Sequence, residues 1–347
     1  MPGSEVDRTV KRARLEAVRQ VAQADALLLT SHEAVTWYLE GVRSHVSLAG
    51  PPVVAVRVDA DGDTLFVADN EADRLVAEEL LPSDAARIVR VPWLTPPADA
   101  AAAHGPAVAE ASFAPALRAA RASLLPAERD RYRTLGRDTA EAMTDAAATA
   151  RPELTERALA ADLAHRLVAR GLDPLVILVA GESRLAHRHP LPTDAALGRR
   201  AMLVVCGRRH GLIANATRWV GASDPDQAAI LQVEAAFLDA SRPGARLDDV
   251  FAAGTGAYGA QGFAADEWRR HHQGGPTGYA GRDPRATPDT RDLVQEHHAF
   301  AWNPSAPGVK VEDTVLTTSA GIEVLTADPR WPTVRVGVLD RPAARPY

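Results

Sequence analysis

The sequence predicts an α+β protein in which a small α/β domain precedes a larger domain of long helices and antiparallel strands. Three observations support this fold class. Short β-rich runs punctuated by Gly, Pro and Asp occupy residues 24–93. Long segments with helical spacing begin at residue 126, and strand-like runs that alternate with a further helix follow them.

The first domain is expected over residues 1–124. Strands are predicted within 24–31, 51–69 and 86–93, and the apolar residues of 71–81 have the spacing of a helix. The Ala- and Pro-rich stretch 96–115 has weak periodicity, which favours a connecting segment, although residues 107–117 also fit a helix. The change of pattern after this stretch places the domain boundary near Leu124.

The second domain is expected over residues 125–347. Helices are predicted over 127–150, 155–171 and 225–241, the middle one with Thr155 as N-cap and Gly171 as C-cap. Strand-like runs at 174–181, 201–207, 212–221, 299–307 and 308–326 indicate that these helices pack on an antiparallel sheet. Gly211 marks a tight turn between two of these strands, and the run SAG at 319–321 marks a second hairpin.

Composition restricts the class of protein. The chain has 347 residues, 46% hydrophobic and 24% charged, which is ordinary for a globular protein of two domains. A net charge of -6 argues against a nucleic-acid or anionic-membrane partner. Neither a signal peptide nor a long apolar span is recognisable, so a cytoplasmic location is expected. The lone Cys206 lies in an apolar strand, which favours an inert buried thiol over a catalytic cysteine.

Five short motifs, in order along the chain, resemble those of the creatinase/aminopeptidase P/prolidase family. They are VTWYLEGVR (35–43), LGRRAMLVV (197–205), ATR (216–218), AWNP (301–304) and GVKVEDTVL (308–316). The resemblance covers essentially the whole chain. It implies a C-terminal domain of the pita-bread fold, preceded by a smaller α/β domain of the creatinase type.

The resemblance also implies where two divalent metal ions would be held. Family peptidases use two Asp, one His and two Glu, whose four carboxylates balance the charge of the ions. The matching residues here are Val204, Asn215, Gly275, Asn303 and Glu312. Because only one carboxylate remains, we expect neither a dinuclear metal site nor another cofactor. A single weakly held ion on Glu312 and a nearby histidine is the minor alternative.

Polar side chains nevertheless remain in the segments that line the family's cleft. His271 is the expected general acid or base, because imidazole titrates near neutral pH. Glu312 is expected to lie partly buried beside a histidine or Lys310 with a perturbed pKa, and a structural role is the alternative for both. The creatinase acid/base position falls on His187 in the ungapped register and on His189 after a two-residue slip.

Other polar residues are expected to bind substrate. Arg218 and Arg282 suit a substrate carboxylate, or else pair with Asp313 or Asp283. The two asparagines keep the shape of a carboxylate and both donate and accept hydrogen bonds. The complete expected set is Asn215, Arg218, His272, Tyr279, Arg282, Asn303 and Lys310.

Three functional hypotheses follow. The preferred one is a metal-independent, creatinase-like hydrolase that uses histidine and Glu312 to break a C–N bond of a small amino-acid-like, guanidino or amide substrate. The second is a catalytically silent peptidase-like protein that binds a peptide, a metabolite or a protein partner. The third is an Xaa-Pro aminopeptidase with an atypical metal site. The resemblance further implies a homodimer, in which Arg43 and His45 reach a neighbouring site.

Overall fold

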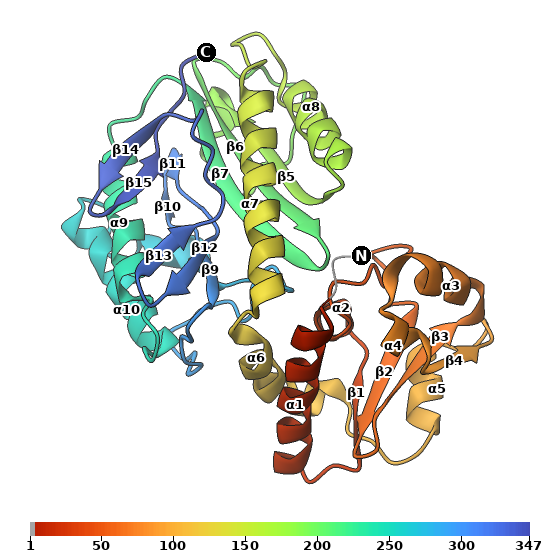
Figure 1. Cartoon of the computed structure of the whole chain (residues 1–347). Coiled ribbons are helices and arrows are strands. Elements are labelled where there is room, and N and C mark those ends of the chain that lie inside the picture. Colours follow the sequence, from red (N-terminus) through yellow and green to blue (C-terminus); the bar gives the residue numbers. More distant parts are fainter. Residues whose placement is uncertain (1–3) are drawn as a thin grey trace. The chain divides into compact units, whose positions relative to one another are not determined.

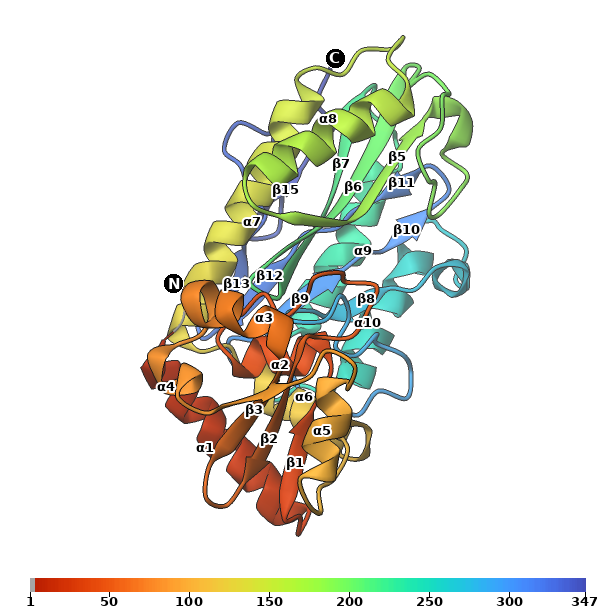
Figure 2. The same ribbon diagram turned by 90° about the vertical axis from the view of Figure 1, so that its right-hand side faces the viewer.

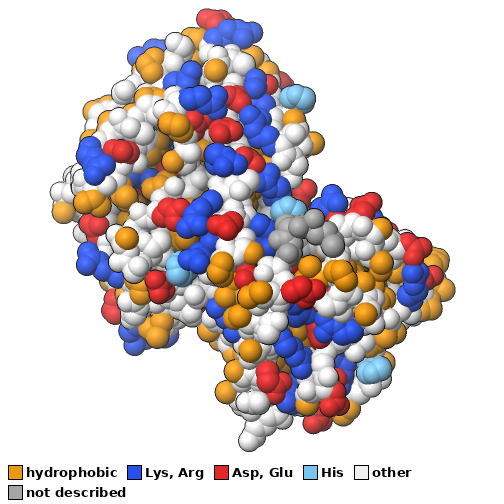
Figure 3. Space-filling model, viewed as in Figure 1, with side chains coloured by type: hydrophobic (Ala, Val, Ile, Leu, Met, Phe, Trp, Pro, Cys, Tyr) orange, Lys and Arg blue, Asp and Glu red, His pale blue; other side chains and the backbone are white. Residues whose placement is uncertain are grey.

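The computed structural model describes residues 4–347, which form two compact units. The first unit comprises the residues up to Arg131 together with the turn His210–Leu212, and the second comprises Tyr132–Arg209 and Ile213–Tyr347. Basic and acidic side chains are interspersed over the face shown in Figure 3. Among residues 4–347, no helix is long and apolar enough to cross a membrane.

The first unit is built on a four-stranded sheet. Its order is β1 (Ala26–Leu29), β2 (Val54–Asp59), β3 (Asp63–Ala68) and β4 (Ile88–Val91), antiparallel except for the parallel pair β3–β4. The long β-rich run 51–69 therefore contains two strands. They are separated because Asp59 Oδ1 accepts hydrogen bonds from the backbone N–H groups of Asp61 and Gly62, both at 3.1 Å, which closes a turn.

Helices flank this sheet (Figure 1). They are α1 (Glu5–Val21), α2 (His32–Tyr38), α3 (Asp69–Arg74) with its π-helical continuation Leu75–Glu79, α4 (Pro82–Ala85), α5 (Pro97–Ala103), the 3-10 turn Glu110–Phe113 and α6 (Ala114–Ala122). The stretch 96–115 is thus partly helical: α5 was not expected, whereas the 3-10 turn and the start of α6 fall within 107–117, the part that also fitted a helix. Alanine gives weak hydrophobic periodicity but favours helix, and Ala101 of α5 packs in the core beside Phe66.

The second unit contains a three-stranded antiparallel sheet of β5 (Asp173–Gly181), β6 (Arg200–Arg209) and β7 (Leu212–Gly221). Helices α7 (Pro126–Ala147) and α8 (Glu156–Ala169) precede it, and α8 packs on β5 (Figure 2). Thr155 Oγ1 accepts from Ala158 N at 3.2 Å, so the predicted N-cap is confirmed. The C-cap is Arg170, one residue before the predicted Gly171, which follows with φ of 73°.

A two-residue turn joins β6 to β7, as the sequence predicts. His210 and Gly211 both have positive φ, 51° and 79°, which is the backbone of a type I′ hairpin turn. Because the register is fixed by this turn, alternate side chains of β7 point to opposite faces of the sheet.

The rest of the second unit holds a four-stranded antiparallel sheet, order β13-β12-β9-β8, and two short hairpins. The strands are β8 (Gly274–Pro276), β9 (Ala299–Trp302), β10 (Ser305–Ala306), β11 (Val309–Lys310), β12 (Val315–Thr318), β13 (Gly321–Val324), β14 (Thr333–Val336) and β15 (Leu339–Pro342). Helices α9 (Gln227–Ala240) and α10 (Leu247–Ala260) pack on each other, and α9 contacts β9. The core between them stacks Phe237 on Trp302, with ring centroids 4.5 Å apart.

Candidate active site

Three histidines from two segments of the second unit lie together. His271 and His272 follow the 3-10 turn Glu267–Arg270, and His189 lies in the loop before β6. Nε2 of His271 is 3.1 Å from Nε2 of His189, and the rings of His189 and His272 stack with centroids 5.7 Å apart. The exposed His187 instead uses its backbone N–H to donate to Arg184 O at 3.1 Å. The structure therefore brings His189, and not His187, against His271.

A chain of hydrogen bonds behind this pair determines where the protons sit. Arg188 Nη1 donates to Ser305 Oγ at 3.1 Å, and Ser305 Oγ lies 3.0 Å from His271 Nδ1. All of these bonds are satisfied when the serine hydroxyl donates to Nδ1, since a guanidinium only donates. His271 then carries its proton on Nε2 and donates it to His189, whose own proton is on Nδ1. With the opposite tautomers, the Ser305 proton has no acceptor within residues 4–347.

The three imidazoles are neutral at pH 7. Burial, reinforced by the positive charge of Lys310, lowers the pKa of His271 to about 2. Burial and Arg282 lower the pKa of His272 to about 3. The pKa of the more exposed His189 is also lowered, by burial and then by Lys310.

Glu312 is a fully buried carboxylate held by two cations. Its Oε1 accepts from Arg282 Nη2 at 2.5 Å, and its Oε2 lies 3.3 Å from Lys310 Nζ and 3.4 Å from Thr217 Oγ1. Burial alone would raise the pKa of Glu312, but Lys310 and Arg282 outweigh burial and lower it. The carboxylate is therefore ionised, and Arg282 pairs with it.

Two buried asparagines border Glu312. On β7, Asn215 lies on the same face as Thr217, which contacts Glu312. Asn303 is opposite Glu312 across the β10–β11 hairpin, because Ser305 pairs with Lys310 and the next backbone bond, Val311 N to Pro304 O, continues that ladder. The exposed fractions are 0% for Asn215 and 2% for Asn303. Within the described residues, neither Oδ1 atom has a hydrogen-bond partner.

The amide of Asn215 has a defined orientation. Its Nδ2 donates to Thr277 Oγ1 at 3.1 Å, and Thr277 Oγ1 in turn donates to Ala280 O at 3.3 Å. Because the threonine proton is used toward Ala280, Thr277 accepts from the asparagine. The Asn215 Oδ1 atom therefore faces away from Thr277 and keeps its lone pairs free.

One expected substrate-binding residue, Arg218, lies apart from this group. Arg218 is on the opposite face of β7 from Asn215, and its Nη2 donates to Asp313 Oδ1 at 2.7 Å and to Thr326 O at 2.6 Å. Its partner Asp313 also pairs with the buried Arg341. Tyr279 is buried in the loop after β8. The geometry of Arg218 is that of a structural ion pair, the alternative considered for it.

Other contributing residues were not predicted from the sequence. They are Arg188, Thr217, Ser305 and Thr277, whose partners are given above, and the exposed Arg285. The only local signals were the position of Arg188 between two histidines and of Ser305 directly after Asn303-Pro304. Cys206 is also near, but burial raises the pKa of its thiol to about 12, so the thiol stays protonated and inert.

The five residues that the sequence resemblance places at the family's metal positions do not fit a pair of divalent ions. Val204 packs in an apolar cluster with Leu178 and Trp219. Gly275 has φ of 133°, and a Cβ there would lie 2.9 Å from Ala286 N and 3.0 Å from Pro284 O. Backbone atoms therefore fill the space that a ligand histidine needs. The two amides and one ion-paired carboxylate cannot balance four positive charges.

The three clustered histidines are a second conceivable metal site. Their ligand atoms lie within 4.8 Å of one another, which satisfies the donor count of a zinc-like ion. However, two of the nitrogens are engaged in the bond between His189 and His271. The positive groups that lower the histidine pKa values also oppose a divalent cation, so this group is a poor metal site electrostatically.

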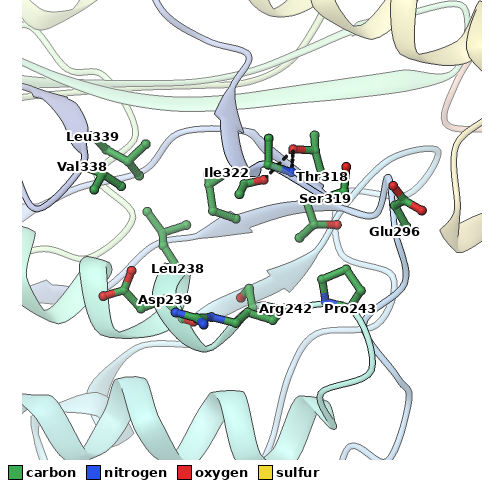
Figure 4. Close-up of a pocket in the computed structure, with 14 residues that line it drawn as sticks. Leu238, Asp239, Arg242, Pro243, Glu296, Thr318, Ser319, Ile322, Val338 and Leu339 are labelled. Atoms are coloured by element: carbon green, nitrogen blue, oxygen red, sulfur yellow. Dashed lines mark hydrogen bonds between the residues drawn. The ribbon is translucent and has the colours of Figure 1, made fainter.

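A separate cavity of about 580 Å³ lies elsewhere in the second unit (Figure 4). Apolar side chains from α9, β13 and the β14–β15 hairpin converge on it, namely Leu238, Ile322, Val338 and Leu339. None of the histidines or asparagines described above lines this cavity. The chemistry of the candidate site is therefore not located there.

The chain belongs to metallopeptidase family M24, whose family model matches residues 130–319. The matched residues contain most of helix α7 and all of helices α8–α10 and strands β5–β12. Four of the five motifs noted in the sequence lie within the matched residues, and the motif at 35–43 precedes them. No curated protein gives a significant match to the chain.

Solved structures show the same fold over nearly the whole chain. Dipeptidase PepE from Mycobacterium ulcerans has a TM-score of 0.77 and 19% identity, covering 99% of this chain and 100% of that chain. The prolidase from Pyrococcus horikoshii OT3 has a TM-score of 0.74 and 16% identity, covering 92% and 99%. The N-terminal domain of FACT complex subunit SPT16 from Cicer arietinum (chickpea) has a TM-score of 0.68 and 13% identity, covering 92% and 96%. The predicted pita-bread domain, with a smaller α/β domain before it, is confirmed.

Proposed function

We propose that this chain is a metal-independent hydrolase of the M24 family that breaks a C–N bond of a small amino-acid-like substrate by acid–base chemistry. The observation that supports it is the hydrogen-bonded pair His189–His271 beside the ionised Glu312. The sequence resemblance assigns Glu312 to one family metal position and places Val204, Asn215, Gly275 and Asn303 at the other four, so a single carboxylate remains. The site is thus polar and ordered rather than filled with aliphatic side chains.

In the proposed reaction, the oxygen of a water molecule attacks the carbon of the C–N bond. His189 takes the proton from the water at Nδ1 and then gives it to the departing nitrogen as the bond breaks. His189 can act as a base at Nδ1 only when the proton that it shares with His271 sits on Nε2 of His189. His271 then carries a proton on Nδ1 and donates it to Ser305 Oγ. In this base form the Ser305 proton has no acceptor, so one hydrogen bond is lost relative to the resting tautomers. The loss costs about 1 kcal/mol, so the base form is thermally accessible.

Three single substitutions test this proposal. His189→Gln, His271→Gln and Glu312→Gln should each lower the hydrolysis rate at least about 100-fold. The assay measures amine or ammonia release from a panel of amide, ureido and guanidino compounds in the presence of a chelator. The exposed His187→Gln is the matched control and should keep the full rate. Circular dichroism checks that each variant is folded.

Two results contradict the proposal. One is a near-normal rate in both His189→Gln and Glu312→Gln. The other is an activity that the chelator removes and manganese or cobalt restores, which instead supports an Xaa-Pro aminopeptidase with an atypical metal site.

A binding protein without catalysis is the second candidate function. It is favoured by the low basicity of His271, whose pKa is about 2, and by the complete pairing of Glu312 with Arg282 and Lys310. A site without an activated base binds but does not turn over. Saturable binding of a ligand by calorimetry, with no product after prolonged incubation, would support this alternative.

A further inference from the structure

We propose that the site selects ligands that combine a neutral N–H donor group, such as an amide or ureido group, with a carboxylate, and that it discriminates against guanidinium and ammonium ligands. This inference rests on the proposed function for the location of the site. It narrows the substrate class to N-acyl or N-carbamoyl amino acids. The feature that carries it is a pair of buried acceptor oxygens surrounded by an excess of positive charge.

The acceptor oxygens are those of the two buried asparagines. In the part of the chain that the structure describes, Oδ1 of Asn215 and Oδ1 of Asn303 are buried without a hydrogen-bond partner. A buried acceptor without a partner is unfavourable and is normally satisfied. The direction of the Asn215 amide is set by Thr277, so its free atom is an acceptor rather than a donor. A ligand group that fits this pair must donate N–H or O–H bonds.

The charges around these oxygens determine whether a neutral or a cationic donor group of a ligand binds better. The acidic groups of the site are already paired, Glu312 with Arg282 and Lys310 and Glu267 with Arg188. The exposed Arg285 has no carboxylate partner among residues 4–347, and its charge contributes to lowering the pKa of His189 and of His272. A cationic donor would enter a region of net positive charge, whereas a neutral donor would not.

The same charges favour a carboxylate elsewhere on the ligand. Arg285 offers an unpaired guanidinium, which binds carboxylates in a two-bond fork. A ligand that is only an anion would place lone pairs against the asparagine oxygens. Only a ligand with both a neutral donor group and an acidic group satisfies both features.

A pair of compounds differing in one group tests the inference directly. N-carbamoylglycine and guanidinoacetate have the same skeleton, but the first has a neutral ureido oxygen where the second has a cationic nitrogen. Isothermal titration calorimetry on the full chain should show that N-carbamoylglycine binds at least about tenfold tighter. Asn215→Asp and Asn303→Asp place a negative charge at the acceptor and should each shift the preference at least about tenfold toward guanidinoacetate.

Two further variants serve as controls. Asn70→Asp makes the same charge change at an exposed residue of the first unit and should leave the preference unchanged. Arg285→Gln should weaken N-carbamoylglycine about tenfold but leave the uncharged N-methylurea unaffected. Together they separate the acceptor effect from a general change of net charge.

The outcomes are distinct from those of the hydrolysis assay. Guanidinoacetate binding as tightly as N-carbamoylglycine, an unchanged preference in both aspartate variants, or no saturable binding of either compound overturns the ligand class, whether or not the protein is a hydrolase. The expected selectivity without any hydrolysis overturns the hydrolase proposal and leaves the ligand class standing.

Discussion

Arg188 illustrates how a residue outside the reacting groups sets their properties. It is held by Glu267 and donates to Ser305, so the serine proton is directed at His271. The direction of the hydrogen bond from Ser305 to His271 decides which nitrogen of His271 carries a proton. It thereby also decides which nitrogen of His189 is protonated. In the resting site the two imidazoles that contact each other thus differ: His271 donates to His189, and His189 is the more exposed of the two.

The tautomers can be measured. Nitrogen NMR of histidine-labelled protein near neutral pH should show His271 protonated on Nε2 and His189 on Nδ1. Ser305→Ala removes the group that distinguishes the two nitrogens of His271 and should give a mixture. A wild-type protein with His271 protonated on Nδ1 would contradict the assigned hydrogen-bond chain.

Buried neutral histidines also predict how stability depends on pH. Burial lowers the pKa of His271 to about 2 and that of His298 to about 4, while an unfolded chain gives about 6.5. Below that unfolded value the unfolded state binds more protons, so stability is lost as the pH falls from neutrality toward the folded pKa values. Each such histidine contributes about 1.4 kcal/mol per pH unit in this window.

Urea unfolding at neutral pH and at about pH 5 measures this dependence. The wild type should be less stable at the lower pH. His298→Asn removes one titrating group, so the difference in unfolding free energy between the two pH values should shrink. An equal difference in the variant would show that His298 is not neutral in the folded state.

At the scale of elements, the site depends on the loop before β6, which carries His189, and on three further chain segments of the second unit. The β6–β7 hairpin supplies Asn215, the β10–β11 hairpin places Asn303 opposite Glu312, and the segment entering β8 supplies the two adjacent histidines. The glycine-rich start of β8 permits close approach of backbone, because a Cβ on Gly274 would lie 2.1 Å from Ala301 O. The same closeness excludes a side chain at Gly275.

The packing of α9 against α10 gives a stability prediction. A Cβ on Gly254 of α10 would lie 2.2 Å from the ring of Phe237 on α9, so Gly254→Ala should destabilise the fold by about 1–3 kcal/mol. Gly256→Ala on the same helix meets nothing within 4 Å and should be neutral or stabilising. Thermal unfolding compares the two. Equal melting temperatures would contradict the described helix contact.

At the scale of the whole molecule, sequence patterns predicted much of the fold but only part of the site. The β6–β7 turn and the Thr155 cap depend on local chemistry and were predictable. Helix α10 was not, because its three glycines lower its propensity and its contact with Phe237 is tertiary. The choice of His189 over His187 and the role of Ser305 depend on the course of loops, which no local pattern encodes.

The chain combines the M24 fold with residues that do not suit a dinuclear metal site. The M24 fold extends over nearly the whole chain, and the sequence resemblance places Val204, Asn215, Gly275 and Asn303 at metal positions of the family's peptidases. Gly275 is enclosed by the backbone of Pro284 and Ala286, so a simple loss of side chains does not describe the change. We propose that the fold has been kept and the site rebuilt around histidines, amides and fixed cations.

The metal content of the purified protein decides whether the site works without metal. Freshly purified, untagged protein is analysed by plasma mass spectrometry, and again after incubation with manganese, cobalt or zinc followed by desalting. We predict that no ion is retained at a stoichiometric level. About two ions per chain would contradict the claim and restore a dinuclear peptidase site. About one ion per chain, lost in His272→Ala, would equally contradict it and place the metal on the three histidines.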